Sequence, residues 1–124
     1  MRKAVGLLFI KNNEILLVRE KDDFWKLPGG KPESRESDIE CLKREIKEEL
    51  DTDVFVENFY GRFIGITPHR RDLLEGVAYF GYFTKIMTPS REIDDAEFVS
   101  NPSDYPLSDI TKKIIDSLKR DHYI

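Results

Sequence analysis

The sequence has very little cysteine, no long apolar run and no excess of basic residues. Its single cysteine, Cys41, excludes an internal disulfide framework and favours a reducing compartment. The apolar run near the N-terminus stops at Lys11, so it is too short to span a bilayer and predicts a strand. The net charge of −4 leaves no basic footprint for a nucleic-acid polymer. We therefore expect a cytoplasmic protein with neither a membrane nor a stable nucleic-acid partner.

The chain has room for one compact domain. Its 124 residues, of which 40% are hydrophobic, are enough to bury roughly two thirds of the unfolded surface around one core. No repeat, low-complexity tract or linker divides the sequence. We expect residues 1–124 to form a single domain, present as a monomer or a homodimer.

The pattern of apolar residues predicts several strands and two helices. Strands are expected at residues 3–10, 14–19, 53–63 and 76–86. The first two strands are mostly apolar, which favours a sheet covered on both faces, and the polar turn between them predicts a hairpin. Each helix has an apolar face, one made of Ile39, Leu42, Ile46 and Leu50 and the other of Ile110, Ile114, Ile115 and Leu118.

The first helix, expected at residues 37–50, carries an unusual concentration of acids. Ser37 and Glu40 form the capping box that begins it. At about 100° per residue, Glu49 and Glu48 lie about 40° and 60° to either side of Glu45, so the three carboxylates share one face. Two carboxylates about 5 Å apart repel by roughly 3 kcal/mol at an effective dielectric constant near 20, and a divalent cation removes that repulsion. A solvated charged face is the alternative interpretation.

These carboxylates suit metal-assisted phosphate chemistry. Mg²⁺ takes oxygen ligands and keeps waters and substrate phosphates in its shell. Arg44, next to Glu45, could fix the orientation of a carboxylate through a bidentate pair. Upstream, Pro28, Gly29 and Gly30 allow a sharp turn and a close approach of the backbone. An ordinary loop before a helix is the alternative for these three residues.

The spacing of these residues resembles the signature of the Nudix (MutT-like) hydrolases. Five residues separate Gly30 from Glu36, and seven residues separate Glu36 from the segment Arg-Glu-Ile-Lys-Glu-Glu at 44–49. The approach to the signature, Trp-Lys-Leu-Pro-Gly at 25–29, is similar as well. The order of the expected elements extends the resemblance over nearly the whole chain.

Three residues depart from the family pattern. Asp51 and Thr52 stand where the family's pattern ends in glycine and an aliphatic residue, and Arg35 stands where glycine often precedes the glutamate. A glycine at that helix end adopts the left-handed conformation, which Asp adopts at a cost of about 1 kcal/mol. None of these changes removes a carboxylate. They therefore bear on the local backbone geometry more than on the metal site.

The resemblance implies an α/β fold of the α+β type, with a mixed β-sheet sandwiched between helices. It implies Mg²⁺-dependent hydrolysis of a pyrophosphate bond, with Mn²⁺ as an alternative metal, in a nucleoside diphosphate linked to another moiety. The implied metal ligands are Glu45, Glu48 and Glu49, and the implied catalytic residues are Arg44, Glu48, Glu49 and Glu92. Glu92 is included as an additional metal ligand or general base because the family often has an acid in a loop six residues before an aromatic residue at a strand start. A solvated loop acid is the alternative interpretation of Glu92. Glu36 is implied to support the structure of the signature loop.

Four residues are candidates for binding the substrate, namely Gly29, Gly30, Lys31 and Arg19. The two glycines let the backbone approach phosphates, and the two cations could reach a phosphate or remain solvated. The only compact basic cluster, at residues 69–71, could meet a terminal phosphate or form an ordinary exposed loop.

The substrate and one other class of function stay open. Pro68, 16 residues after Thr52, lies near the proline that marks the ADP-ribose pyrophosphatase subgroup, whereas the short chain fits a MutT-type nucleoside triphosphate pyrophosphohydrolase. A nucleotide sugar is a third candidate. The alternative to an enzyme is a catalytically inactive nucleotide-binding or sensing module, against which the intact acidic set counts.

Overall fold

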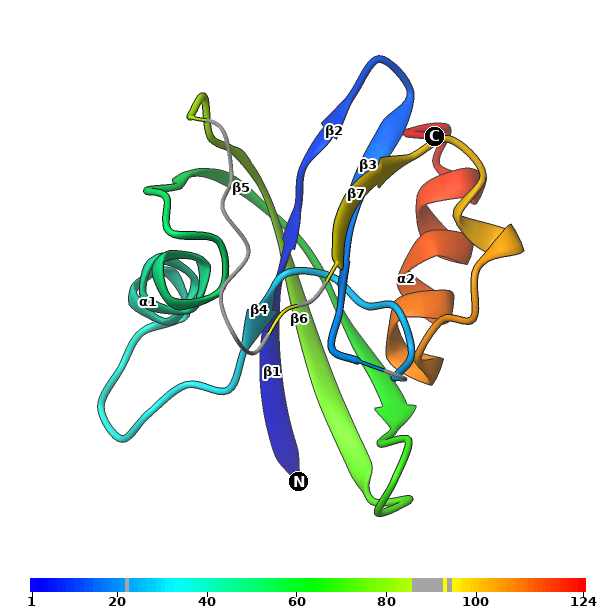
Figure 1. Ribbon diagram of the computed structural model, residues 1–124. Helices are drawn as coiled ribbons and strands as arrows, with labels where there is room; N and C mark the ends of the chain where they lie inside the picture. Colours follow the sequence, from blue (N-terminus) through cyan, green and yellow to red (C-terminus); the bar gives the residue numbers. More distant parts are fainter. Residues whose placement is uncertain (22, 86–92, 94) are drawn as a thin grey trace.

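The computed structural model describes residues 1–21, 23–85, 93 and 95–124 of the chain. Two β-sheets lie between two helices, with α1 on one side and α2 on the other (Figure 1). One sheet is mixed and has the strand order β4-β1-β6-β5, and the other is antiparallel with the order β2-β3-β7. The predicted α+β fold with helices on both sides is therefore confirmed, although the structure has two sheets where one mixed sheet was expected.

The strands and helices have the following bounds. The mixed sheet contains β4 (Gly29–Gly30), β1 (Arg2–Leu8), β6 (Leu73–Tyr82) and β5 (Phe55–Ile66). The antiparallel sheet contains β2 (Ile10–Lys11), β3 (Glu14–Arg19) and β7 (Asp95–Val99). The helices are α1 (Asp38–Leu50) and α2 (Asp109–Arg120), and the short 3-10 helix η1 (Pro102–Asp104) precedes α2. Within these described residues, neither α-helix is long and apolar enough to cross a membrane.

The predicted strand at residues 3–10 is wrong in one respect, because the chain leaves one sheet for the other at Phe9. β1 pairs with β6 in the mixed sheet, whereas β2 pairs with β3 in the antiparallel sheet. The predicted hairpin is confirmed for β2 and β3, and Asn12 and Asn13 form its turn with φ of 53° and 61°. Asparagine tolerates this left-handed conformation better than most residues, which explains the turn.

Two later strands have different boundaries from those predicted. β5 begins at Phe55 rather than at the predicted Asp53, and it continues through Gly65 to Ile66, beyond the predicted end at Phe63. β6 begins at Leu73, three residues before the predicted start at Gly76, and ends at Tyr82. β5 stays paired with β6 as far as Ile66, with register shifts between Val56 and Gly61, so the glycines do not end β5.

The core forms two clusters, one beneath each helix. β3 is buried on both faces, because Leu16 and Val18 belong to the α1 cluster while Ile15 and Leu17 belong to the α2 cluster. This arrangement confirms the prediction of a sheet covered on both faces. Each of these side chains stabilises the fold by about 1.5–3 kcal/mol through burial.

Helix α1 begins as the sequence predicts. Ser37 caps it, with its Oγ accepting from the Glu40 amide at 3.1 Å and its own amide donating to Glu40 Oε1 at 2.9 Å. Cys41 is fully buried. The assignment of Ile39 to the buried face is wrong, since its side chain is 43% exposed.

Asp38 explains why Ile39 is exposed. In the first turn of α1 it is Asp38 that faces the mixed sheet, where it pairs with Lys3 Nζ at 2.7 Å and accepts from the Tyr79 hydroxyl at 2.9 Å. The buried face of α2 agrees with the prediction at Ile114, Ile115 and Leu118. Ile110 is partly buried, and it packs against the same core cluster while lining a cavity.

Candidate active site

Helix α1 packs its acidic face against the short strand β4. Glu49 lies in this contact and is only 5% exposed. Its Oε1 accepts a hydrogen bond from the Gly29 amide at 2.9 Å. Burial raises the pKa of Glu49 to about 8, and the hydrogen bond from Gly29 opposes that rise. Glu49 is therefore the innermost of the three predicted carboxylates.

Glu45 lies directly against Gly30. A Cβ atom on Gly30 would lie 2.4 Å from Cδ of Glu45, whereas ordinary contact begins at 3.4 Å. Burial raises the pKa of Glu45, and the neighbouring Arg44 opposes the rise. The absence of a side chain on Gly30 thus makes the space in which this carboxylate sits.

Gly29 is required for a different reason. Its φ of 139° is rarely adopted by L-residues, and a Cβ there would lie 2.0 Å from the carbonyl oxygen of Val5 on β1. Both glycines therefore serve the packing of the chain itself. Their predicted approach to phosphates stays a prediction.

Arg44 holds the carboxylates of the signature in place. It forms a bidentate pair with Glu36, with Nε 2.8 Å from Oε2 and Nη2 2.9 Å from Oε1. Its Nη1 donates to Glu45 Oε1 at 3.0 Å and lies 3.4 Å from Glu48 Oε2, and its Nη2 donates to the Lys31 carbonyl at 3.0 Å. Hydrogen bonds from Arg44 lower the pKa of Glu36 to about 2. One guanidinium therefore orients three glutamates and the loop before α1.

Two of the departures from the family pattern, Asp51 and Arg35, fall at left-handed backbone positions. Asp51 ends α1 with φ 53° and ψ 41°, and its amide donates to the Lys47 carbonyl at 3.0 Å. Arg35 has φ 65° in a turn that is closed by the Glu36 amide and the Glu33 carbonyl at 3.1 Å. Glycine is favoured at both kinds of position. Asp51 and Arg35 therefore adopt the left-handed backbone conformation at a cost in free energy that glycine would avoid.

The oxygen donors that could hold a divalent cation are Glu45, Glu48 and Glu49. In the described part of the chain, no three His, Cys, Asp or Glu side chains already converge closely enough to enclose an ion. Mg²⁺ is usually bound through one or two carboxylates together with substrate phosphates, so a complete protein cage is not required for it. The donor set therefore fits Mg²⁺.

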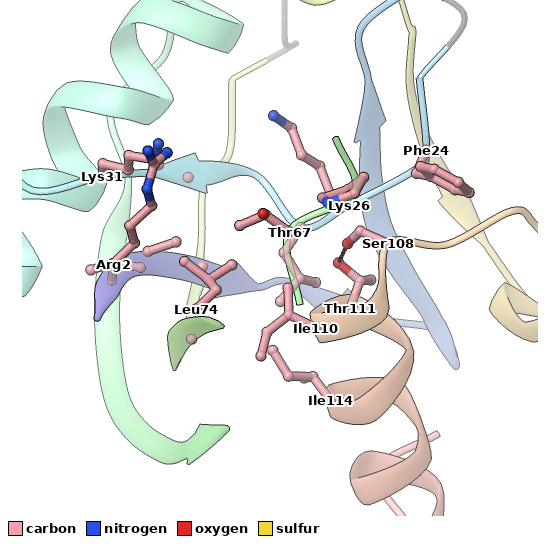
Figure 2. A pocket seen from close by; sticks show the side chains of 18 of the residues that line it. Arg2, Phe24, Lys26, Lys31, Thr67, Leu74, Ser108, Ile110, Thr111 and Ile114 are labelled. Atoms are coloured by element: carbon pink, nitrogen blue, oxygen red, sulfur yellow. Dashed lines mark hydrogen bonds between the residues drawn. The ribbon is translucent and has the colours of Figure 1, made fainter. Parts of the chain in front are cut away.

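A cavity of about 350 Å³ opens beside β4. It lies between β1, the start of β6, the loop at residues 67–70 and the first turns of α2, as Figure 2 shows. Its apolar lining includes Leu27, Ile66, Leu74, Ile110 and Ile114. This volume is near the lower end of the range of small-molecule sites, about 300–1,000 Å³.

Basic side chains border the cavity. Its lining includes Arg2, Lys26, Lys31, His69 and Arg70. Among the described residues of the lining, Asp23 is the only acid. A cavity with this border attracts anions even though the whole chain has a net charge of −4.

The structure brings together most of the predicted site residues. Gly29, Gly30 and Lys31 line the cavity, next to the acidic face of α1. Arg19 is not part of the described lining, and its Nη2 pairs with Asp95 Oδ2 at 2.7 Å. Glu92 lies outside the residues that the structure describes.

Sequence reasoning missed the residues that form the walls of the cavity. Phe24, Ser108 and Thr111 come from segments that are far apart in sequence and meet only in the folded chain. Their residue types are ordinary, so no local pattern distinguishes them. Pro68 and the basic cluster at 69–71 were the available signals, and Pro68, His69 and Arg70 do line the cavity.

Comparison with protein families gives one match that covers almost the whole chain. The family model described as NUDIX domain matches residues 1–118. A search of curated proteins finds no match to this sequence.

Solved structures of the same fold are numerous. The chain is similar to the MutT protein from Methanosarcina mazei Go1, with 21% identity, a TM-score of 0.82 and coverage of 98% of this chain and 94% of that chain. It is similar to a MutT NUDIX hydrolase from Burkholderia pseudomallei, with 21% identity, a TM-score of 0.79 and coverage of 93% and 95%. A bifunctional NMN adenylyltransferase/ADP ribose pyrophosphatase from Francisella tularensis, complexed with AMP and a Mn ion, shares 21% identity at a TM-score of 0.67, with coverage of 97% and 41%.

Proposed function

Since the chain belongs to the Nudix family and is a pyrophosphohydrolase of that type, we propose that it hydrolyses a nucleoside diphosphate linked to another moiety, with Mg²⁺ as cofactor. The observation that carries this proposal is the contact between two parts of the fold. The acidic face of α1 packs on Gly29 and Gly30, and the same two glycines line the cavity with its basic border. The diphosphate would therefore lie at Gly30, between the carboxylates and the cavity.

Several residues of the chain would bind the anionic part of the substrate. Lys31, Lys26 and Arg2 lie on the side of the cavity that contains β4, and in Figure 2 the side chains of Lys31 and Arg2 extend toward each other. Cations at this place compensate the charge of a diphosphate in a partly dehydrated site. The apolar interior of the cavity would take the nucleoside, since it offers surface for a flat ring and room for one such group.

Glu45, Glu48 and Glu49 would hold Mg²⁺. When it is bound, Mg²⁺ neutralises phosphate oxygens and lowers the pKa of a coordinated water. Arg44 keeps Glu45 and Glu48 in place through its bonds to both, and Glu36 in turn fixes Arg44 by a bidentate pair. Manganese would suit the same oxygen donors.

The hydrolysis itself is a displacement at phosphorus. The oxygen of water forms a bond to phosphorus while the bridging P–O bond breaks, and the leaving group departs as a phosphate anion. A carboxylate of α1, Glu48 or Glu49, accepts the proton of the attacking water. Glu48 is 55% exposed at its side chain and Glu49 is buried, so the two candidates differ in their access to water.

A product screen tests this function directly. The purified chain is incubated with Mg²⁺ and a panel that contains nucleoside triphosphates, ADP-ribose, nucleotide sugars and dinucleoside polyphosphates, and the products are separated by chromatography. The expected result is release of a nucleoside monophosphate or diphosphate from at least one member, and none when Mg²⁺ is removed with EDTA. Binding of a nucleotide without any release of product would instead support a binding or sensing module.

A further inference from the structure

One aromatic side chain at the mouth of the cavity is exposed on a fixed backbone. Phe24 lines the cavity and is 42% exposed, with its ring at the rim beside Ser108 in Figure 2. The next residue, Trp25, is buried, and its amide donates to the Pro106 carbonyl at 2.8 Å. The following amide, of Lys26, donates to the Val18 carbonyl at 2.9 Å. The ring is thus held in an exposed position by a backbone that is anchored on two sides.

A hydrogen bond between side chains joins the loop that carries Phe24 to the opposite loop of the cavity. Asp23 Oδ1 accepts the Phe24 amide at 2.8 Å and lies 3.1 Å from His69 Nε2. Because an ionised carboxylate can only accept, His69 is the donor. His69 belongs to a loop closed by the Thr67 amide and the Asp72 carbonyl at 2.9 Å. Asp23 and His69 are 46 positions apart in the sequence, so this bond sets the distance between two loops that border the same cavity.

The interior of the cavity offers little that would recognise a polar group. Two of the three hydroxyls in its described lining, those of Ser108 and Thr111, are buried and bonded to each other at 2.7 Å, as the dashed line in Figure 2 shows. The third, of Thr67, accepts the Asp72 amide at 3.0 Å. The surrounding side chains are apolar, among them Ile66, Leu74 and Ile110. A flat aromatic ring suits such a place because it has two apolar faces and stacks on phenylalanine, whereas a saturated sugar has no such face.

We propose that Phe24 is a specificity-determining residue on which the base of the substrate stacks, and that the bond between Asp23 and His69 positions it. This inference rests on the proposed function and deepens it. Stacking on Phe24 favours diphosphates that carry an aromatic base over diphosphates without a base. Phe24 would contact the substrate directly. Asp23 and His69 would act through Phe24 and are positioning residues.

Binding without hydrolysis is the first test. The fluorescence of Trp25, the only tryptophan of the chain, reports binding of adenosine 5′-monophosphate and of ribose 5-phosphate in the absence of metal. Phe24→Leu is expected to weaken binding of the nucleotide by about 5- to 150-fold and to leave ribose 5-phosphate unchanged. Phe24→Tyr keeps a stacking ring and restores the affinity. Phe55→Leu is the matched control, because Phe55 is also exposed, at 56%, and does not line the cavity.

Steady-state kinetics with the best substrate of the panel is the second test. Phe24→Leu lowers kcat/KM mainly by raising KM. His69→Ala raises KM by a smaller factor, and His69→Gln, which can still donate to Asp23, restores it. In the Phe24→Leu background, His69→Ala adds little, since the two residues act through one contact.

The outcomes separate this inference from the proposed function. Equal nucleotide affinity in wild type, Phe24→Leu and Phe55→Leu would overturn the role of Phe24. Additive effects of Phe24→Leu and His69→Ala would overturn the positioning role of His69. If the wild type binds nucleotides through Phe24 and hydrolyses none of the panel, the proposed function fails and the stacking site stands.

Discussion

The same substitution at two neighbouring glycines is expected to have opposite consequences. Gly29→Ala places a Cβ 2.0 Å from the Val5 carbonyl oxygen, at a φ of 139° that alanine rarely adopts. Backbone strain of about 1–3 kcal/mol and overpacking of similar size add to roughly 2–6 kcal/mol of lost stability. A domain is stable by only about 5–15 kcal/mol, so this loss is a large part of the total. Since 1 kcal/mol shifts the midpoint of thermal unfolding by about 4 °C in a domain of this size, the midpoint falls by at least about 8 °C.

Gly30→Ala should keep stability and lose turnover. The Cβ would lie 2.4 Å from Cδ of Glu45, so that carboxylate has to move by about 1 Å to reach ordinary contact. Because the end of a flexible side chain can move, and because alanine restricts the unfolded chain, stability changes by less than about 1 kcal/mol. A displacement of about 1 Å in the reacting geometry costs on the order of 100-fold in rate.

Two measurements on the same preparations decide this prediction. Urea unfolding followed by circular dichroism gives the stability of each variant, and hydrolysis of the best substrate with Mg²⁺ gives its rate. Near-normal turnover in Gly30→Ala would refute the placement of Glu45 at the reacting centre. Equal destabilisation by both substitutions would refute the distinction between backbone overlap at Gly29 and side-chain overlap at Gly30.

Three further predictions concern the loop and helix of the signature. Arg44→Lys removes the planar fork that binds Glu36 at two atoms and reaches Glu45, so turnover is expected to fall by about 10- to 100-fold while the circular dichroism spectrum is kept; unchanged turnover would contradict this. The pKa of Glu36 is lowered to about 2 by hydrogen bonds from Arg44, so the stabilisation is present above pH 4.5 and is lost as the pH falls toward 2. Glu36→Gln should therefore flatten the fall of the unfolding free energy between these pH values, and a parallel fall would contradict it. Arg35→Gly should raise the free energy of unfolding, measured by urea unfolding, by up to about 1 kcal/mol. Asp51→Gly should raise it by less, because Asp tolerates the left-handed conformation better than Arg does. Destabilisation by Arg35→Gly would contradict this.

The signature helix could be predicted from sequence because its information is local. The capping box of Ser37 and Glu40 fixes the start of α1, and the spacing of the acids fixes their shared face. What could not be predicted is how deeply each acid lies. Glu49 is buried because α1 packs on β4, where its Oε1 accepts from the Gly29 amide, whereas Glu48 is exposed. That contact joins residues 20 positions apart in the sequence.

The boundaries of the strands and the cavity depend on pairing between distant segments. The division of the first strand at Phe9 follows from the existence of two sheets, which an apolar run cannot reveal. β4 is only two residues long and was predicted as a turn, yet it pairs with Val5 and Gly6 of β1 and positions the glycines. The walls of the cavity likewise come from α2 and from loops that meet only after folding.

The central claim is that the acidic face of α1 carries metal-dependent hydrolysis. Its most direct test compares two isosteric substitutions, Glu48→Gln on α1 and Glu57→Gln on β5, both at exposed residues. Turnover of the best substrate is measured over a range of Mg²⁺ concentrations, together with urea unfolding. Glu48→Gln is expected to lower turnover by at least about 100-fold with stability changed by less than about 0.5 kcal/mol, and Glu57→Gln is expected to change neither. Turnover in Glu48→Gln close to that of wild type at every Mg²⁺ concentration would contradict the account.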